Sequence, residues 1–220
     1  MPTLALLHTV TTLPAVFQPL VRQALPGWSS FNILDESLLQ HTVRDGVLSN
    51  RTKQRLTQYV FSAIDAGADA VVVTCSTLGN AVDGIASSTS LPIFRIDQGM
   101  ADEAVRKARR IGVLATLPTT LEPTGTVIRN AARAAGKDCI AMEKLCDGAF
   151  DRLAAGDPAS HDAMVIDGFT ELASQTDLIV LAQASMAHAL KSLGQPKVSY
   201  LTSPELGIAH VARELAALSA

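Results

Sequence analysis

The sequence is poor in the features that mark nucleic-acid-binding, membrane-spanning and secreted proteins. Its 220 residues contain 18 Lys and Arg against 21 Asp and Glu, with no run of five or more basic residues, which argues against a nucleic-acid surface. Aromatic residues make up only 4%, too few for base-stacking platforms. No apolar stretch approaches the roughly 18 residues that span a bilayer, and the first residues lack the basic start of a signal peptide. We therefore expect a soluble, cytoplasmic protein without nucleic-acid or membrane partners.

Cysteine, metal-ligand and nucleotide-binding patterns are equally scarce. The three cysteines, Cys75, Cys139 and Cys146, cannot all pair and form no C-x-x-C spacing, so free thiols in a reducing compartment are the simplest interpretation. His161 and His188 belong to no H-x-x-x-H or H-E-x-x-H pattern, and the chain has neither G-x-G-x-x-G nor a P-loop. We expect no metal and no cofactor.

Short apolar runs and helical segments alternate along the whole chain. Leu56 to Ile64 before Gly67 and Leu121 to Ala135 before Gly136 have helical spacing with a terminating glycine. Eight apolar runs are candidate buried strands: Leu4–Leu7, Phe31–Leu34, Ala70–Val73, Leu91–Ile96, Ile111–Ala115, Cys139–Met142, Leu178–Ala182 and Val198–Leu201. The alternation predicts parallel sheets with crossover helices, and so an α/β fold.

The chain also resembles itself at a nearly constant offset. The segment 69–78 lies over 177–186 at an offset of 108, and 7–12 lies over 114–119 at an offset of 107. Either any two strand-turn-helix units look alike, or the chain is a duplicated α/β half whose two lobes face each other across a cleft. In the second case the residues that follow each strand should line the cleft, because ligands bind at the carboxyl ends of parallel strands. These residues are His8, Thr9, Asp35, Glu36, Cys75, Ser76, Thr77, Thr116, Thr119, Gln183, Ala184, Ser185, Thr202 and Ser203.

Cys75 is the leading candidate for chemistry. It follows a buried strand and precedes Ser76, Thr77 and a helix start, where backbone N–H groups lower a thiol pKa from ~8.5 toward neutrality. We therefore expect Cys75 to be the most reactive of the three thiols. The alternative is an inert buried cysteine, which is the interpretation we give to Cys139 and Cys146.

Hydroxyls and one histidine complete the candidate site. Thr116, Thr119, Thr120 and Thr124 crowd the turn after Ile111–Ala115, where they could hold a carboxylate or cap a helix. His8 follows the first strand and could carry a proton at neutral pH, or be a buried histidine with satisfied hydrogen bonds.

These motifs together resemble the aspartate/glutamate/hydantoin racemase superfamily over nearly the whole chain. They are Val72–Thr77, Gly112–Thr116 with Thr119, and Leu181–Met186. The resemblance implies two flavodoxin-like lobes with parallel sheets related by pseudo-two-fold symmetry, an active site in the cleft between them, and no cofactor. It also implies a cysteine from each lobe on either side of the substrate α-carbon.

Three of the family's positions are altered in this sequence. The first cysteine matches Cys75, whereas the second falls at Gln183, which cannot exchange a proton at neutral pH. His8 stands at the position of the acidic helper, and Ser185 stands where glutamate racemases have a histidine. The resemblance further assigns Ser76 and Thr77 to the polar residues after the first cysteine, and Thr116 and Thr119 to the carboxylate-binding threonines.

The sequence therefore predicts a cofactor-independent enzyme that transfers a proton at the α-carbon of a small carboxylate, amino acid or hydantoin-like substrate. Cys75 would be the acid/base, His8 or a water would replace the second thiol, and Gln183 would orient the substrate. Substrate contacts would come from Thr9, Ser76, Thr77, Thr116, Thr119 and Ser185. The alternatives are a one-face decarboxylase or cis/trans isomerase, and a non-catalytic carboxylate-binding protein. Residues 1–97 with 204–220 should form one lobe and 98–203 the other, and a homodimer is plausible.

Overall fold

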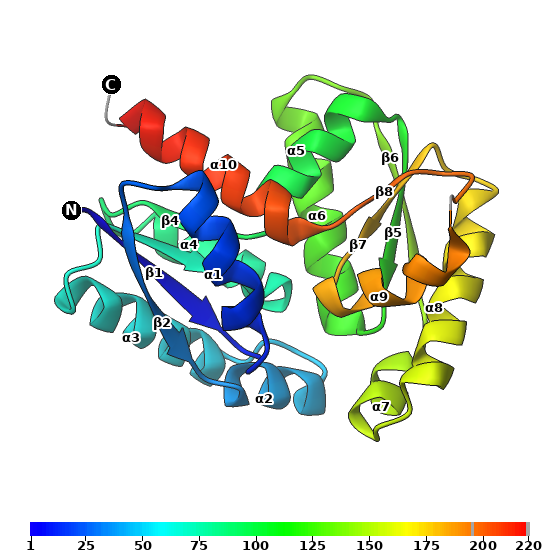
Figure 1. Cartoon of the computed structure of the whole chain (residues 1–220), viewed down its shortest axis with the longest axis horizontal. Helices are drawn as coiled ribbons and strands as arrows, with labels where there is room; N and C mark the ends of the chain where they lie inside the picture. The colour runs from blue at the N-terminus through cyan, green and yellow to red at the C-terminus, as the bar shows by residue number, and fades with distance from the viewer. Residues whose placement is uncertain (195, 219–220) are drawn as a thin grey trace. The chain divides into compact units, whose positions relative to one another are not determined.

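The chain divides into two compact units, each built on its own parallel sheet (Figure 1). The computed structural model describes residues 1–194 and 196–218. One unit contains Met1–Gly99 and the chain from Pro204 onward, and the other contains Met100–Ser203. Each sheet has four strands with crossover connections, so the predicted α/β class with two parallel sheets is confirmed.

The first unit has the strand order β2-β1-β3-β4. Its strands are β1 (Thr3–His8), β2 (Ser29–Leu34), β3 (Ala70–Val73) and β4 (Ile93–Arg95). Its helices are α1 (Leu13–Ala24), α2 (Ser37–Asp45), α3 (Asn50–Asp65), the 3₁₀ turn η1 (Ser76–Leu78), α4 (Gly79–Ala86) and α10 (Ser203–Leu218).

The period of two along β1 explains how helices cover both faces of this sheet. Ala5 and Leu7 pack with α2, α3 and α4 on one face, whereas Leu4 and Leu6 pack with α1 and α10 on the other. Because both faces are covered, the strand needs apolar residues at every position, which is why it reads as a continuous apolar run. The C-terminal helix α10 thus completes the core of the unit in which the chain begins.

The second unit repeats this plan with the order β6-β5-β7-β8. Its strands are β5 (Arg110–Ala115), β6 (Ile140–Leu145), β7 (Leu178–Leu181) and β8 (Tyr200–Leu201). Its helices are α5 (Gln98–Lys107), α6 (Pro118–Ala134), α7 (Ala149–Ala154), α8 (Pro158–Ala173) and α9 (Ala187–Leu190), with 3₁₀ turns η2 (Ala184–Met186) and η3 (Lys191–Leu193). Helix α6 packs on β5 and β6, and α8 packs on β5, β6 and β7.

The predicted ends of two helices are confirmed at glycines. Gly67, with φ of +87°, follows α3, and Gly136, with φ of +62°, follows α6. Other residues rarely adopt this left-handed conformation, so glycine ends each helix at little cost. All eight predicted strands are present, although β4 and β8 each begin two residues later than their apolar runs.

The internal repeat extends to the hydrogen bonds of the two sheets. The β1–β3 register pairs Leu7 with Val73, and the β5–β7 register pairs Leu114 with Leu181, at the offsets of 107 and 108. At the other edge, the Thr3 N–H donates to the Asp69 carboxylate over 2.7 Å, and the Arg110 N–H donates to the Asp177 carboxylate over 3.0 Å. Within the described residues no helix is long and apolar enough to cross a membrane.

Candidate functional site

In the first unit, parallel pairing brings the ends of β1 and β3 side by side. The Thr74 N–H donates to the Leu7 carbonyl over 3.0 Å, which continues the ladder past β3. The residues that follow, His8 and Thr9 on one strand and Cys75 on the other, are therefore neighbours. All of them are buried.

His8 is held through both ring nitrogens. Its Nδ1 lies 2.8 Å from Thr74 Oγ1, and its Nε2 lies 2.9 Å from Asn32 Oδ1 on β2. Nε2–H can donate to the Asn32 carbonyl oxygen. The Thr74 hydroxyl lies within reach of two acceptors, the Leu7 carbonyl oxygen at 3.1 Å and, in a neutral ring, His8 Nδ1. Burial lowers the pKa of His8, and the Asn32 bond only partly opposes this. The ring is therefore neutral, and it links β1 to β2 through Asn32 and to the end of β3 through Thr74. Neither Asn32 nor Thr74 was among the predicted site residues.

Cys75 is 9% exposed and immediately precedes η1. Burial raises the pKa of its thiol, while the Thr9 and Thr77 hydroxyls and the N–H groups of Thr77 and Leu78 act in the opposite direction. The Thr9 hydroxyl favours the thiolate although it makes no hydrogen bond of ordinary geometry with any described residue. The sequence-based expectation of a lowered pKa is wrong, because burial outweighs the donors at the helix start.

The carboxylate after β2 serves the fold. Asp35 accepts from the N–H and hydroxyl of Ser37 over 2.9 and 2.6 Å, from the Tyr59 hydroxyl over 2.8 Å, and from Arg55. Burial raises the pKa of Asp35, but these donors outweigh it and leave the pKa below its ordinary value. Asp35 therefore anchors α2 and α3, and the adjoining Glu36 is the N-cap residue that precedes α2.

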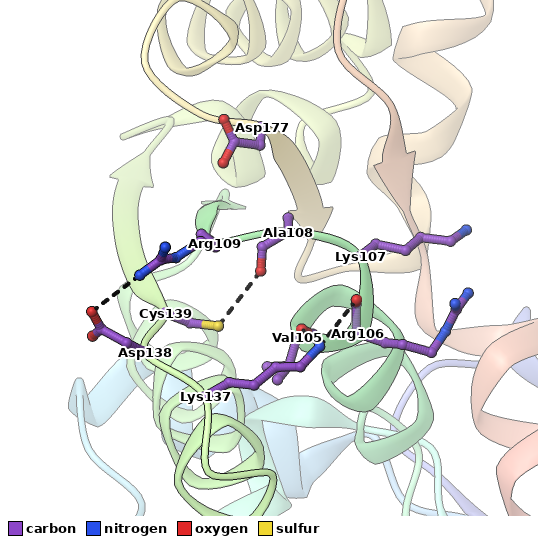
Figure 2. A pocket seen from close by; sticks show the side chains of 9 residues that line it. All are labelled: Val105, Arg106, Lys107, Ala108, Arg109, Lys137, Asp138, Cys139 and Asp177. Carbon is purple, nitrogen blue, oxygen red and sulfur yellow. Dashed lines mark hydrogen bonds and ion pairs between the residues drawn. The ribbon is translucent and has the colours of Figure 1, made fainter.

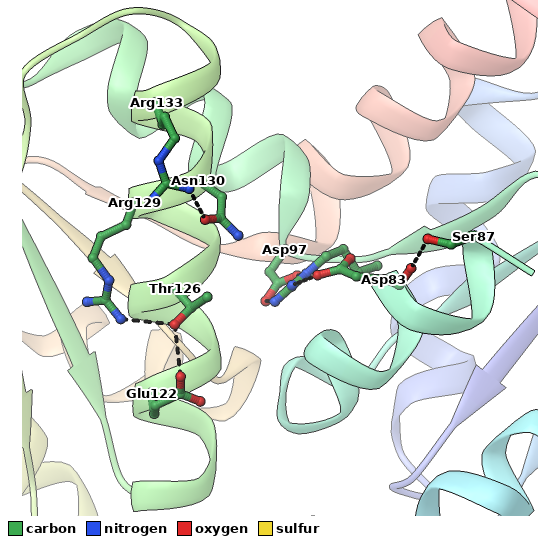
Figure 3. Close-up of polar contacts among 9 residues, drawn as sticks. Asp83, Ser87, Asp97, Glu122, Thr126, Arg129, Asn130 and Arg133 are labelled. Carbon is green, nitrogen blue, oxygen red and sulfur yellow. Dashed lines mark hydrogen bonds and ion pairs between the residues drawn. The ribbon is translucent and has the colours of Figure 1, made fainter.

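A buried ion pair that was not predicted from the sequence lies beside η1. Arg95 donates to both carboxylate oxygens of Asp97 over 2.7 and 3.0 Å and to Asp83 over 2.7 Å. The guanidinium lies against Gly79, where an added Cβ would come within 2.2 Å of Nη2. Figure 3 shows Asp83 and Asp97 at this cluster. An arginine within the apolar run Leu91–Ile96 was the available signal, because a buried charge requires a partner.

In the second unit, Gln183 occupies the position equivalent to Cys75, and its side chain makes two hydrogen bonds with Thr116. The Thr116 N–H donates to Gln183 Oε1 over 2.9 Å, and Gln183 Nε2 donates to Thr116 Oγ1 over 2.8 Å. The structure thus brings these two predicted residues together. Thr116 is buried and Gln183 is half-buried, whereas Ser185 in η2 is exposed.

The other threonines lie in a helix and not in the turn. Pro118 begins α6, so Thr119, Thr120 and Thr124 are helical residues, and the predicted crowded turn is corrected. Proline is favoured at the first helical position, and this signal was present in the sequence. No side chain caps α6, since Leu117 stands at the cap position. The Thr119 and Thr124 hydroxyl oxygens are buried and make no hydrogen bond with a described residue.

Local pairs occupy the polar side chains farther along α6. In Figure 3 Thr126 donates to Glu122 over 2.9 Å and accepts from Arg129 over 2.9 Å, and Arg133 donates to Asn130 over 3.1 Å. Such pairs at helical spacing stabilise an exposed helix face. They give no sign of a binding site.

The two remaining cysteines lie at opposite ends of β6. Cys146 follows β6, where its N–H donates to the Ala115 carbonyl at the end of β5 over 2.8 Å. Cys146 is buried against Gly168, and burial raises the pKa of its thiol to about 11. Cys139 is half-buried and lies 3.5 Å from the Ala108 carbonyl oxygen. It lines a cavity of about 550 Å³ at the opposite, amino-terminal edge of the sheet (Figure 2).

The charged groups that line this cavity already have partners. Lys137 donates to the Val105 and Arg106 carbonyls over 3.0 and 3.2 Å, and Arg109 lies 3.5 Å from Asp138. Arg106 and Lys107 both pair with Glu103, and Asp177 pairs with Arg110. The cavity is therefore not a candidate active site.

The histidines of the second unit share one carboxylate. His161 Nδ1 lies 2.8 Å from Asp162 Oδ1, and His188 Nδ1 lies 3.3 Å from Asp162 Oδ2. His161 is buried, and its Nε2 has no partner among the described residues. Within that part of the chain no group of three or more His, Cys, Asp or Glu side chains could hold a metal.

Comparison with known proteins confirms the resemblance inferred from the motifs. A family model described as Asp/Glu/Hydantoin racemase matches residues 9–211. No curated protein matches the chain in sequence.

Solved structures share the fold at low sequence identity. Glutamate racemase isoform RacE1 from Bacillus anthracis has a TM-score of 0.75 at 16% identity, covering 99% of this chain and 82% of that chain. A putative Asp/Glu racemase from Yersinia pestis has a TM-score of 0.71 at 18% identity, with coverages of 97% and 99%. Allantoin racemase from Klebsiella pneumoniae has a TM-score of 0.63 at 17% identity, with coverages of 100% and 89%.

Proposed function

Because the chain belongs to the Asp/Glu/hydantoin racemase family and is thus an isomerase of the racemase type, we propose that Cys75 is its acid/base. The reaction is proton transfer at the α-carbon of a small carboxylate, amino acid or hydantoin-like substrate, without a cofactor. The observation that supports it most is the surroundings of Cys75: a buried thiol at the end of β3, with hydroxyls and N–H groups that favour its thiolate.

The raised pKa of Cys75 suits this role. At neutral pH the resting thiol carries its proton and can donate it to a carbanion. Once deprotonated, a thiolate of higher pKa is a stronger base toward a weakly acidic C–H bond. The Thr9 and Thr77 hydroxyls and the N–H groups at η1 stabilise that thiolate, so that the deprotonated form can still be reached.

The other candidate residues have supporting roles in this proposal. His8 positions the end of β3 through Thr74, since its two nitrogens are engaged and its pKa is lowered. Thr9, Ser76 and Thr77 contact the substrate beside the thiol. In the second unit, the residues proposed to give neutral hydrogen bonds to substrate are Thr116, Thr119, Gln183 and Ser185.

A one-face reaction is the second candidate, and the Gln183 contact favours it. A carboxamide cannot take up a proton at neutral pH, and this one is engaged with Thr116 through both polar atoms. A decarboxylase or cis/trans isomerase needs only Cys75, which would protonate a carbanion or add to a carbon–carbon double bond.

Deuterium exchange tests the proposal. Glutamate, aspartate and 5-methylhydantoin, each as separate enantiomers, are incubated with the chain in D₂O, and label and configuration at the α-carbon are followed by NMR and chiral chromatography. We expect exchange above the enzyme-free rate that falls by ~10²-fold or more in Cys75→Ser. Inversion identifies a racemase, and exchange with retention identifies one-face chemistry.

Cys139→Ser is the matched control, because Cys139 lies at the amino-terminal edge of the other sheet and should leave the rate unchanged. Equal rates in Cys75→Ser and the unaltered chain would refute Cys75 as the acid/base.

A further inference from the structure

The two hydrogen bonds between Gln183 and Thr116 determine how each polar atom is used. The Thr116 backbone N–H can only donate, so the carboxamide atom that lies 2.9 Å from it must be the oxygen, Oε1. The atom 2.8 Å from Thr116 Oγ1 is therefore the nitrogen, which can only donate. Thr116 Oγ1 thus accepts a bond from Gln183, and its own hydrogen is directed elsewhere.

Two hydrogens remain unused in this pair. The Thr116 hydroxyl hydrogen has no acceptor among the described residues, and neither does the second N–H of Gln183 Nε2. The two donor atoms are 2.8 Å apart, close enough to donate to the same acceptor oxygen or to two oxygens of one group. Gln183 also fixes the Thr116 hydroxyl as a donor, because its N–H already fills the acceptor side.

We propose that Gln183 is a positioning residue that makes this strand end a neutral, donor-only site for a substrate oxygen that carries or develops negative charge. This inference rests on the proposed function and identifies the group recognised: a carboxylate, or the enolate oxygen formed when the α-proton leaves. The residues 115–117 and 182–184 at the ends of β5 and β7 are all uncharged. Preorganised neutral donors of this kind stabilise an oxygen more strongly as its charge grows.

A pH-dependent variant separates this role from simple packing. In Gln183→Glu the ionised carboxylate can accept from the Thr116 N–H but cannot donate to Thr116 Oγ1. When protonated, the same side chain presents a carbonyl oxygen and an O–H, which restores both bonds to Thr116. It does not restore the second N–H of Gln183. The extent to which binding recovers therefore measures how much of the affinity depends on the Thr116 hydroxyl.

Binding is measured in the Cys75→Ala background so that no chemistry intervenes. Glutamate, aspartate and 5-methylhydantoin are titrated by calorimetry, and the tightest of the three is followed from pH 8 to pH 5. We expect Gln183→Glu to weaken binding about 10- to 100-fold at pH 8, the effect of losing a hydrogen bond to a charged group, and to regain most of it at pH 5. Thr116→Val should remove this recovery, whereas Thr116→Ser should retain it.

Gln58→Glu is the matched control, since Gln58 is exposed on α3 and the same charge there should change nothing. Binding that is unaffected by Gln183→Glu, weak at both pH values, or absent for all three probes overturns the inference. These outcomes are distinct from failure of the proposed function, which appears as Cys75-independent exchange in otherwise unaltered chains.

Discussion

The two units have the same sheet but different side chains at the end of their third strand in sequence. In both, the residue after that strand donates its N–H to the first strand, Thr74 to Leu7 over 3.0 Å and Ala182 to Leu114 over 2.9 Å. In both, a 3₁₀ turn begins two residues after that one. Cys75 and Gln183 therefore occupy equivalent backbone positions. The comparison shows that the repeated backbone fixes where a side chain stands, whereas one residue decides whether that place can exchange a proton.

The partner threonine differs in the same way. In the second unit the backbone N–H and the side-chain oxygen of Thr116 are both bonded to Gln183. In the first unit the equivalent Thr9 hydroxyl makes no hydrogen bond of ordinary geometry with a described residue and acts on the Cys75 thiol instead. A thiol is a weak hydrogen-bond partner, so the threonine beside it keeps capacity for a ligand.

The largest expected effect comes from making the two positions alike. Gln183→Cys should raise α-proton exchange or racemisation ~10²- to 10⁴-fold for whichever carboxylate binds, because it introduces a titratable group at the second strand end. The new thiol lacks a neighbouring histidine, since Ser185 stands there, so exchange should be measured from pH 7 to 9. Gln183→Ser is the control, because it opens the Gln183–Thr116 pair without adding an acid/base.

A folded, ligand-binding Gln183→Cys chain that shows no gain anywhere in this pH range would mean either that positions 75 and 183 do not act on one substrate or that the reaction is not at the α-carbon.

The next test concerns close packing against glycine in each unit. Gly79→Ala should unfold the first unit more readily, because the new Cβ would lie 2.2 Å from Arg95 Nη2 and would displace a guanidinium held by Asp97. Disrupting a buried ion pair costs about 3–5 kcal/mol. Gly168→Ala should cost less, about 1–3 kcal/mol, because the nearest atoms to its Cβ would be the uncharged Cys146 Sγ at 2.7 Å and Leu114 Cδ1 at 3.1 Å.

Urea denaturation of both variants gives the comparison. Adding Cys146→Ala to Gly168→Ala should restore part of the loss, since it removes the crowded sulfur. Gly84→Ala, with no heavy atom near its would-be Cβ, is the control. A larger loss from Gly168→Ala than from Gly79→Ala would mean that the ion pair can shift to make room.

Strand positions and the two-unit repeat could be predicted from the sequence because they depend on local apolar runs and their offset. The pKa of Cys75 could not, because its burial comes from helices distant in sequence. The hydrogen bonds between Gln183 and Thr116 join residues 67 positions apart, and only the β5–β7 register brings them together. The internal repeat did place both residues at strand ends. Their proximity could therefore be predicted, but the hydrogen bonds between their side chains could not.

Thiol labelling is expected to reverse the order predicted from the sequence. Cys139 is half-buried, whereas Cys75 and Cys146 are buried with raised pKa values. Because the thiolate is the nucleophile, iodoacetamide at pH 7.5 should modify Cys139 about 10-fold faster than either. Mass spectrometry of digested samples gives the three rates, and labelling in urea should make them similar. Faster labelling of Cys75 in the folded chain would show that its donors outweigh burial.

The smallest effect distinguishes the equivalent carboxylates Asp69 and Asp177. Asn at position 69 can still accept from the Thr3 N–H, so Asp69→Asn should change the melting temperature little. Asp177 also pairs with the Arg110 side chain over 2.6 and 3.0 Å, and these bonds, followed by the bond from the Arg110 N–H, lower the pKa of Asp177. Asp177→Asn should therefore lower the melting temperature at pH 7, although modestly because the pair is exposed.

The pH dependence of this difference follows from the lowered pKa of Asp177. The ionised carboxylate stabilises the folded chain fully above the unfolded value of ~3.9, and this stabilisation disappears as the pH falls through the lower folded value. Melting temperatures of the unaltered chain and Asp177→Asn should therefore converge as the pH falls through the folded pKa of Asp177, whereas those of the unaltered chain and Asp69→Asn should stay close at pH 7. A difference in melting temperature between the unaltered chain and Asp177→Asn that persists unchanged at low pH would contradict this. It would show that the carboxamide disturbs packing at the start of β7, and that the loss of charge is not the cause.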